Sequence, residues 1–143
     1  MRYAYPIDLT PEDDGSAVTA QAPDIPGVTT WGDTAAEALH NVVDALAAGL
    51  EVAIERGEPI PAPSAPRRGQ VVVDLPPIVA AKLALYEAMR TQGIKKSELA
   101  RRIGVDESLA RRLLDLRHRS RIDQLERALG AVGLRMQMHI VAA

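Results

Sequence analysis

The feature that most constrains the fold is a glycine, Gly104, set between two short amphipathic segments within residues 95–114. An apolar stripe at helical spacing lies on each side of it: Leu99, Ala100 and Ile103 before it, and Ala110, Leu113 and Leu114 after it. Glycine favours the left-handed conformation that ends a helix, and Asp106 is a typical N-cap for the next one. We therefore predict two short helices joined by a tight turn, with Ser97 as the N-cap of the first.

The front of the second predicted helix is polar and cationic. At about 100° per residue, the side opposite the apolar stripe carries Glu107, Ser108, Arg111 and Arg112. A helix that is apolar behind and cationic in front suits the major groove of DNA, where arginine bonds guanine bidentately. We expect these four side chains to face base edges. We expect a second set, at helix starts and on the following loop, to hold phosphates: Lys95, Lys96, Ser97, Arg117, Arg119 and Arg121. The alternative for such a pattern is a solvated charged surface.

Charge is divided unevenly along the chain. Residues 1–66 contain two basic residues against eleven acidic ones, a net charge of −9, whereas residues 67–143 contain fifteen against eight, a net charge of +7. Such a division predicts two domains with different partners. The basic half suits phosphates, and the acidic half would repel DNA and attract a cationic molecule.

The acidic half has the pattern of a small α+β domain. Four strands are expected, at residues 3–9, 16–22, 28–31 and 71–75. Pro6 lies within the first of them and predicts an edge strand or a bulge, because proline cannot donate to a ladder. The pair Asp14-Gly15 predicts the turn of a hairpin between the first two strands. A capping box from Thr34 to Glu37 opens a helix that runs to about Arg56 and completes a β-β-β-α-β unit.

The basic half is predicted to be helical, with a strand at its end. Ser120 is interpreted as the cap of a last helix, whose core face is Ile122, Leu125, Leu129 and Val132. Beyond it, apolar residues alternate with polar ones, at Leu134, Met136, Met138 and Ile140. A single strand after a helical bundle has no partner in its own domain, and pairing with the same strand of a second copy would satisfy its edge. We therefore expect dimerisation through these four residues.

Several motifs resemble one known family, in order and over nearly the whole chain. In the basic half, the resemblance to the Cro-like helix-turn-helix repressor domain of HicB-type antitoxins is carried by Leu85–Met89, Ser97–Gly104, Arg112–Asp115 and His118–Ser120. In the acidic half, the resemblance to the N-terminal domain of the same family is carried by Tyr5-Pro6, Pro23–Gly27, Gly32–Thr34, Glu37-Ala38 and Pro59–Ser64. The fold of that domain is similar to a truncated RNase H.

The resemblance implies an antitoxin of a type II toxin–antitoxin system. Residues 1–75 would bind and neutralise a HicA-type toxin, a small basic ribonuclease, and residues 76–143 would form a DNA-binding and dimerisation domain that represses the protein's own operon. A homo-oligomer is expected, as a dimer or a dimer of dimers. One alternative remains open, a helix-turn-helix repressor whose N-terminal domain senses a ligand or another protein. A nuclease is the third possibility.

Other chemistry finds little support in the sequence. A two-metal nuclease would need clustered carboxylates, for which Asp8, Asp24, Asp33 and Asp44 are available, but Asp24 and Asp33 occupy turn and cap positions where aspartate is common. The chain has no cysteine, and its three histidines show no ligand spacing. We therefore expect no catalytic residue, no metal and no cofactor. No run of about 18 apolar residues occurs, so we expect a cytoplasmic protein that does not enter a membrane.

Overall fold

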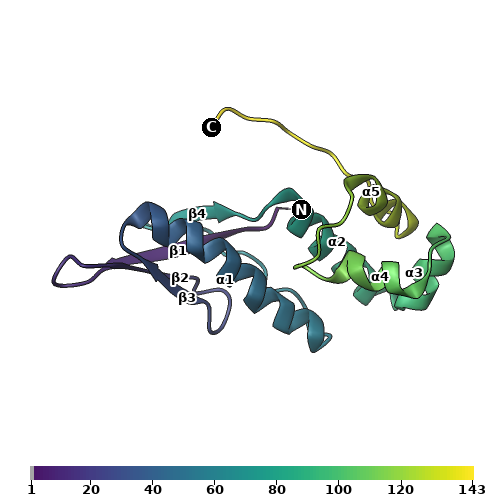
Figure 1. The fold of residues 1–143 in the computed structure, drawn as a ribbon, viewed down its shortest axis with the longest axis horizontal. Coiled ribbons are helices and arrows are strands. Elements are labelled where there is room, and N and C mark those ends of the chain that lie inside the picture. Colours follow the sequence, from purple (N-terminus) through teal and green to yellow (C-terminus); the bar gives the residue numbers. More distant parts are fainter. Residues whose placement is uncertain (1) are drawn as a thin grey trace. The chain divides into compact units, whose positions relative to one another are not determined.

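The computed structural model describes residues 2–143. The chain divides into two compact units, which we call unit 1 (residues up to Pro76) and unit 2 (Pro77–Ala143). Unit 1 has an antiparallel sheet and one helix, whereas unit 2 is helical (Figure 1), so the predicted α+β class is confirmed. The elements are β1 (Ala4–Pro11), β2 (Val18–Gln21), β3 (Thr29–Gly32), α1 (Ala35–Glu55), β4 (Val71–Asp74), α2 (Pro77–Gln92), α3 (Lys96–Ile103), α4 (Glu107–Leu114) and α5 (Ile122–Ala131).

The strand β1 lies inside the sheet, whose order is β3-β2-β1-β4 with every pair antiparallel. The prediction that Pro6 marks an edge strand is therefore wrong. Along an antiparallel strand, every second residue hydrogen-bonds the same neighbouring strand. The Tyr3 carbonyl accepts from the Leu75 N–H at 3.0 Å, and Pro6 lies an odd number of residues after Tyr3, so the Pro6 nitrogen faces away from β4. On that other side, β2 pairs with β1 only from Asp8 onward. Pro6 thus lies beyond the end of β2, and its missing N–H is not needed by either ladder.

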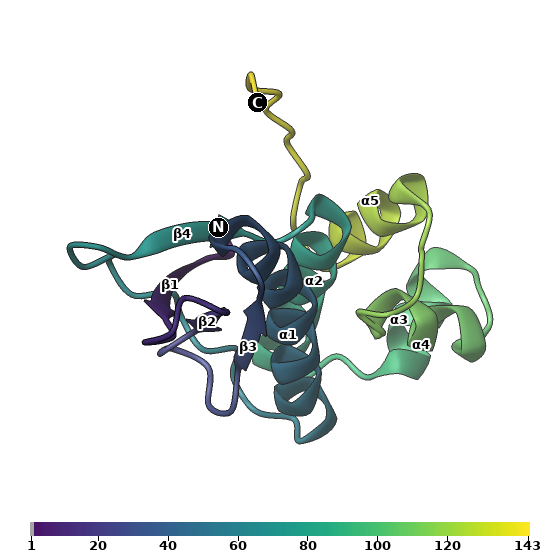
Figure 2. The same cartoon turned by 60° about the vertical axis from the view of Figure 1, so that its left-hand side comes forward.

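The core of unit 1 lies between the sheet and α1, which runs alongside the strands (Figure 2). Alternate residues of β1 and β2 point toward the helix, and α1 turns toward them a stripe of residues three or four apart. The side chains fully buried there include Tyr5, Ile7, Ala20, Val42, Leu46 and Leu50. Burying one large apolar side chain is worth roughly 1.5–3 kcal/mol, so this layer dominates the stability of the unit.

Both ends of α1 are where the sequence predicts them, because each end is set by a residue close to it in the sequence. The Thr34 hydroxyl accepts a hydrogen bond from the Glu37 N–H at 3.1 Å and caps the first turn. At the other end, Gly57 has a φ of +67°, a left-handed conformation that lets the chain leave the helix. The predicted hairpin turn also forms, and Gly15 donates its N–H to the Glu12 carbonyl at 2.9 Å.

Unit 2 is a bundle to which each of the helices α2 to α5 contributes a buried leucine: Leu85, Leu99, Leu113 and Leu125. Two details of the predicted helices are wrong. The helix α3 begins at Lys96 after Lys95, without a side-chain cap, so Ser97 lies inside its first turn. Ile122, which was expected in the core, is 43% exposed at the start of α5, and Ala128 is buried instead.

The predicted C-terminal strand is not formed. Residues 135–143 have no regular secondary structure, and Leu134 continues the end of α5 by donating its N–H to the Leu129 carbonyl at 2.9 Å. The side chains of Met138 and Ile140 are 54% and 87% exposed. A strand requires hydrogen bonds from a neighbouring strand, and the described residues of this single chain supply none to this segment.

Candidate nucleic-acid interface

The turn between α3 and α4 has the geometry expected from its residues. Gly104 adopts φ 71° and ψ 38°, which is the left-handed conformation, and the Val105 N–H returns to the Ala100 carbonyl at 3.0 Å. Asp106 then caps α4, because its Oδ1 accepts from the Leu109 N–H at 2.8 Å. A backbone bond thus closes the end of α3 and a side-chain bond opens α4, so both ends of the turn are fixed.

The four residues predicted to face bases all lie on the exposed side of α4. Glu107, Ser108, Arg111 and Arg112 are open to solvent, while the buried side of the same helix is formed by Ala110, Leu113 and Leu114. Within residues 2–143, neither the Arg111 nor the Arg112 guanidinium takes part in an ion pair, and both are available to a ligand. The helix therefore presents two unpaired cations on a rigid support.

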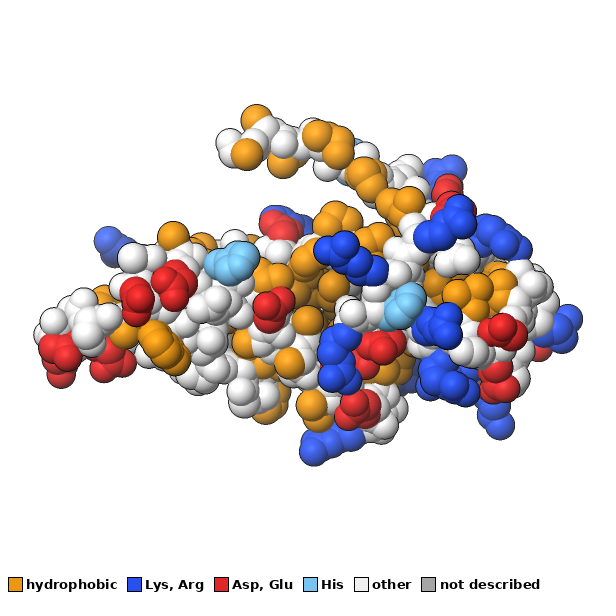
Figure 3. All heavy atoms as spheres, viewed as in Figure 1, with side chains coloured by type: hydrophobic (Ala, Val, Ile, Leu, Met, Phe, Trp, Pro, Cys, Tyr) orange, Lys and Arg blue, Asp and Glu red, His pale blue; other side chains and the backbone are white. Residues whose placement is uncertain are grey.

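The residues predicted to hold phosphates occupy two places. Lys95, Lys96 and Ser97 are exposed at the start of α3, where the unbonded N–H groups of the helix end also favour an anion. The loop after α4 carries the exposed side chains of Arg117, Arg119 and Arg121. Lys and Arg side chains gather over much of unit 2 in Figure 3.

Two of the loop arginines have acidic neighbours. Arg121 makes two bonds to the Asp123 carboxylate, at 3.1 and 2.9 Å, and Arg117 lies 4.0 Å from Asp115. These arginines are about three-quarters exposed, and exposed ion pairs contribute little free energy, so a phosphate can replace the carboxylate partner.

A third pair of arginines, on α3, serves the fold instead. The Glu98 carboxylate accepts from Arg101 at 2.6 and 2.9 Å and from Arg102 at 3.0 Å. These bonds, first from Arg101 and then from Arg102, lower the pKa of Glu98 from 4.5 to about 2. Arg102 also donates to the Ala131 carbonyl (2.9 Å) at the end of α5.

A reciprocal contact runs the other way. Arg127 of α5 donates to the Ile103 carbonyl (2.5 Å) at the end of α3. Each of α3 and α5 therefore has its C-terminal carbonyls bonded by an arginine of the other, where the helix dipole favours a cation. We call this pair of bonds the α3–α5 arginine exchange.

A buried lysine lies behind the candidate interface. Lys82 of α2 is the one charged side chain that the structure buries completely within residues 2–143. Its Nζ lies within hydrogen-bond distance of the carbonyls of Arg112 (2.8 Å), Asp115 (2.7 Å) and His118 (2.8 Å), and of the Ser120 Oγ (2.8 Å), so the three N–H donors of the ammonium are shared among four acceptors. The ammonium thus bonds the C-terminal end of α4 and the loop that follows. We call this arrangement the Lys82 cage.

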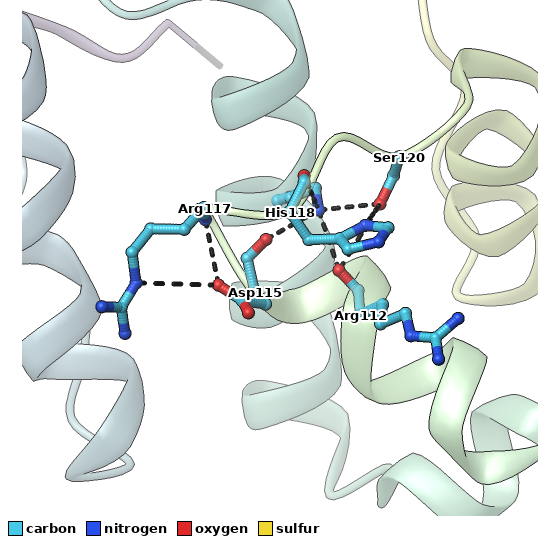
Figure 4. Close-up of polar contacts among 6 residues, drawn as sticks. Arg112, Asp115, Arg117, His118 and Ser120 are labelled. Atoms are coloured by element: carbon cyan, nitrogen blue, oxygen red, sulfur yellow. Dashed lines mark hydrogen bonds and ion pairs between the residues drawn. The ribbon is translucent and has the colours of Figure 1, made fainter.

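The Lys82 cage changes the role of Ser120. Its hydroxyl accepts from Lys82 and lies 3.4 Å from the Arg112 carbonyl, so it does not cap α5, and the prediction that it does is wrong. Figure 4 shows Ser120, Asp115 and the backbone of Arg112 converging, while the Arg112 guanidinium points away from them. The cage therefore bonds the backbone at the end of α4, while the Arg112 side chain remains exposed at the surface.

Sequence reasoning missed Lys82, although a signal was present. Lys82 interrupts an otherwise apolar stretch of α2, with Ala81 and Leu83 buried on either side. A lysine is almost never fully buried unless its ammonium is bonded, so its position inside an apolar helix indicates a partner. Its acceptors lie 30 or more residues away along the chain, which only the fold can identify.

The carboxylates considered for a metal site lie apart from one another. Asp24 accepts from the Ser64 N–H (2.8 Å) and hydroxyl (3.1 Å), and Asp8 accepts from the Gln70 amide (3.0 Å). Among residues 2–143, no three His, Cys, Asp or Glu side chains are grouped so that they could hold a metal ion. In the same range, no helix is both long enough and apolar enough to cross a membrane.

Known proteins resemble this chain over most of its length. A model of the HicB_like antitoxin of bacterial toxin–antitoxin systems matches residues 4–84. Antitoxin HicB 1 of Photorhabdus laumondii subsp. laumondii is 37% identical over 136 residues, which cover 95% of this chain and 86% of that protein. Antitoxin HicB of Pseudomonas fluorescens is 36% identical over 144 residues, covering 100% of this chain and 97% of that protein. Antitoxin HicB of Escherichia coli K12 is 35% identical over 137 residues, covering 96% and 99% respectively. This chain therefore belongs to the HicB-like antitoxin family of bacterial toxin–antitoxin systems.

Proposed function

We propose that this antitoxin binds and neutralises a HicA-type ribonuclease toxin through unit 1, and represses its own operon by binding operator DNA through unit 2. The roles assigned to the two units and to their residues are part of this proposal. Binding alone accounts for both activities, so no catalytic step is assigned to the chain. Both activities place the protein in the cytoplasm.

The observation that carries the DNA-binding half is the exposed face of α4. Arg111 and Arg112 stand unpaired on a helix whose buried side is locked into the bundle and whose entry is set by Gly104. This arrangement supports a helix-turn-helix, a motif in which the second helix enters the major groove and its arginines read guanine. In the proposed complex, Glu107 and Ser108 face bases beside them.

Phosphate contacts are proposed for the two places described above. Lys95, Lys96 and Ser97 would hold one backbone segment at the start of α3. Arg117, Arg119 and Arg121 would hold another, on the loop whose backbone the Lys82 cage fixes.

The toxin-binding half rests on charge. Residues 1–76 contain four basic residues against twelve acidic ones, a net charge of −8. Such a surface accelerates the encounter with a cationic protein and contributes nothing to the binding of phosphates. The HicB family membership supplies a toxin as the expected cationic partner.

A dimer is proposed through the C-terminal segment. Leu134, Met136, Met138 and Ile140 alternate along a stretch that extends from unit 2 without a strand partner in its own chain. Pairing with the same segment of a second copy would bond its backbone and cover its apolar side chains. Two copies would also read two half-sites about one helical turn apart, which gives a single small module its specificity.

The proposal is tested with the full-length chain, its own promoter duplex and the product of the neighbouring reading frame, which we expect to be a HicA-type toxin. The chain is expected to block RNA cleavage by the toxin and to retard the promoter duplex. The double variant Arg111→Ala/Arg112→Ala is expected to lose the promoter and still block the toxin. If the chain binds its promoter and leaves RNA cleavage unchanged, the ligand-sensing repressor replaces the antitoxin. Metal-dependent cleavage of RNA or DNA by the chain alone would identify a nuclease.

A further inference from the structure

We infer that the toxin docks on one face of unit 1, which we call the Trp31 face. It consists of the side of β1, β2 and β3 opposite α1, together with the acidic turn between β1 and β2. Its members are Thr10, Glu12, Asp13, Thr19, Gln21 and Trp31. This inference rests on the proposed function, because it names the surface that the cationic toxin would use.

The strand register places the members of this face together. Thr19 of β2 is paired with Thr10 of β1 on one side and with Trp31 of β3 on the other. Residues directly opposite one another in antiparallel strands project to the same side of the sheet, so the three side chains form one row. Gln21 lies two residues along β2 on the same side. Apart from Thr19, which is half-buried, these side chains are exposed, in contrast to the buried row that meets α1.

Trp31 is the prominent member of the row. It is 60% exposed, it is the sole tryptophan of the sequence, and its surroundings on the face are threonine, glutamine and carboxylate side chains. Its indole borders an open groove of about 470 Å³, which Glu12, Thr19 and Thr29 also line. A large aromatic side chain left exposed beside a groove is typical of an anchor for another protein.

The position of Trp31 is held from behind. The Asn41 amide of α1 donates to the Trp31 carbonyl at 2.9 Å, which ties β3 to the helix. The ring therefore projects from a fixed strand, and a partner would pay little entropy to order it.

A carboxylate, that of Glu12, lines the same groove as Trp31. Glu12 and Asp13 are exposed in the turn at the end of the groove, and the Thr19 hydroxyl donates to Glu12 Oε1 at 3.3 Å. Hydrogen bonds from Ser16, first from its side chain and then from its backbone N–H (2.9 Å), lower the pKa of the Asp14 carboxyl. Acidic side chains gather at this end of unit 1 in Figure 3.

An arginine or lysine of a cationic protein fits this combination. The flat face of an indole attracts a guanidinium or ammonium group, and neighbouring carboxylates add a charged partner for the same cation. Other occupants fit poorly. The same face of a second copy would bring its own carboxylates against these, and DNA would bring phosphates, so both would be repelled. Docking of the basic unit 2 of a second copy is separated from toxin binding by the concentration dependence in the test below. The chemistry of the face thus selects a basic protein.

The test uses the single tryptophan as its probe. Full-length chain labelled with 5-fluorotryptophan has one fluorine resonance, from Trp31, and it is titrated with the same unlabelled toxin. We expect this resonance to shift in a saturable way at equimolar toxin. Trp31→Ala should weaken toxin binding by about tenfold or more, as for an aromatic anchor at an interface centre. Because the side chain is mostly exposed, the thermal unfolding temperature should change little.

A pair of charge variants provides the matched comparison. Glu12→Gln combined with Asp13→Asn should slow association with the toxin and reduce its dependence on salt. Asp44→Asn removes an exposed carboxylate from α1 and should leave both unchanged.

The outcomes separate this inference from the proposed function. If the unmodified chain does not bind the toxin, the proposed function fails. If it binds but the Trp31 resonance does not move and Trp31→Ala binds equally well, the docking face is wrong while the proposed function stands. A resonance that moves with the concentration of the chain alone would show a second copy on this face and would also overturn the inference.

Discussion

Replacing Lys82 by methionine should destabilise unit 2 while leaving unit 1 folded. Methionine keeps an unbranched apolar stem of similar length and removes the ammonium. The carbonyls of Arg112, Asp115 and His118 then lose the ammonium as a donor. The first two keep one backbone N–H each, from Asp115 (3.2 Å) and His118 (3.1 Å). Ser120 keeps its contacts to His118 Nδ1 (3.3 Å) and to the Arg112 carbonyl (3.4 Å).

The magnitude follows from these bonds. A hydrogen bond to a charged group contributes about 1.5–3 kcal/mol, and a buried acceptor left unbonded costs about 1–3 kcal/mol. Water can reach part of the loop, so the three carbonyls do not each lose the full amount, and we expect a total of about 3–5 kcal/mol. Domains of this size have roughly 3–10 kcal/mol of stability at 0.05–0.15 kcal/mol per residue. The substitution should therefore remove a large part of the stability of unit 2.

Urea unfolding followed by two probes checks this expectation. Tryptophan fluorescence reports on unit 1 alone, because Trp31 lies in β3, whereas far-ultraviolet circular dichroism follows the helices, most of which belong to unit 2. At about 1–2 kcal/mol per M, the helical transition of Lys82→Met should move to lower urea by about 2 M or more. The fluorescence transition should change less. The same substitution at an exposed lysine, Lys96→Met, is the control and should shift neither transition by more than about 0.5 kcal/mol.

If the helical transition of Lys82→Met coincides with that of the Lys96→Met control, the Lys82 cage does not stabilise unit 2. Such a result would mean that the loop carbonyls are satisfied equally well by water. A loss of both transitions at the same urea concentration would instead mean that the two units unfold together.

Three further predictions concern unit 2. Arg112→Ala should reduce the preference for operator over random duplex by about 1–3 kcal/mol, whereas Lys96→Ala should weaken both duplexes alike and lower the salt slope by about one; equal losses from both variants in gel-shift titrations would contradict this division. A chain that stops before Leu134 should sediment as a monomer and bind operator poorly, and a dimer of full affinity would place the contact elsewhere. The pKa of Glu98, followed by NMR of its carboxyl carbon, should lie near 2, and Arg101→Gln should raise it. Because folding lowers this pKa, the stability that the ion pairs add is present above about pH 4.5 and is lost as the pH falls toward 2; a midpoint near 4.5 would show that the pairs do not persist in solution.

The parts of the fold that the sequence predicted depend on short-range interactions. Gly104 and Asp106 set the turn between α3 and α4, and Thr34 starts α1, because each acts on residues no more than four positions away. The exposed face of α4 follows from the same local periodicity. The residues proposed to face bases could therefore be placed on α4 from the sequence alone.

The errors arose where a distant part of the chain decided the outcome. Pro6 was interpreted from its missing N–H alone, but its position depends on where β2 ends, about fifteen residues later. Ser120 has the sequence context of a cap, yet the buried ammonium of Lys82 takes its oxygen. The alternation at residues 134–140 is typical of a strand, but no strand forms there, because a strand requires another strand beside it.

The α3–α5 arginine exchange bears on how a signal could travel within unit 2. Residues 134–143 leave directly from α5, so a force applied to this segment reaches α5 first. The bonds from Arg102 to Ala131 and from Arg127 to Ile103 join α5 to α3 at both C-terminal ends, so neither helix can rotate or slide without the other. A rearrangement of the C-terminal segment that turned α5 relative to α3 would therefore have to break these two bonds. We expect pairing of this segment with a second copy to influence α3, the helix that precedes the Gly104 turn.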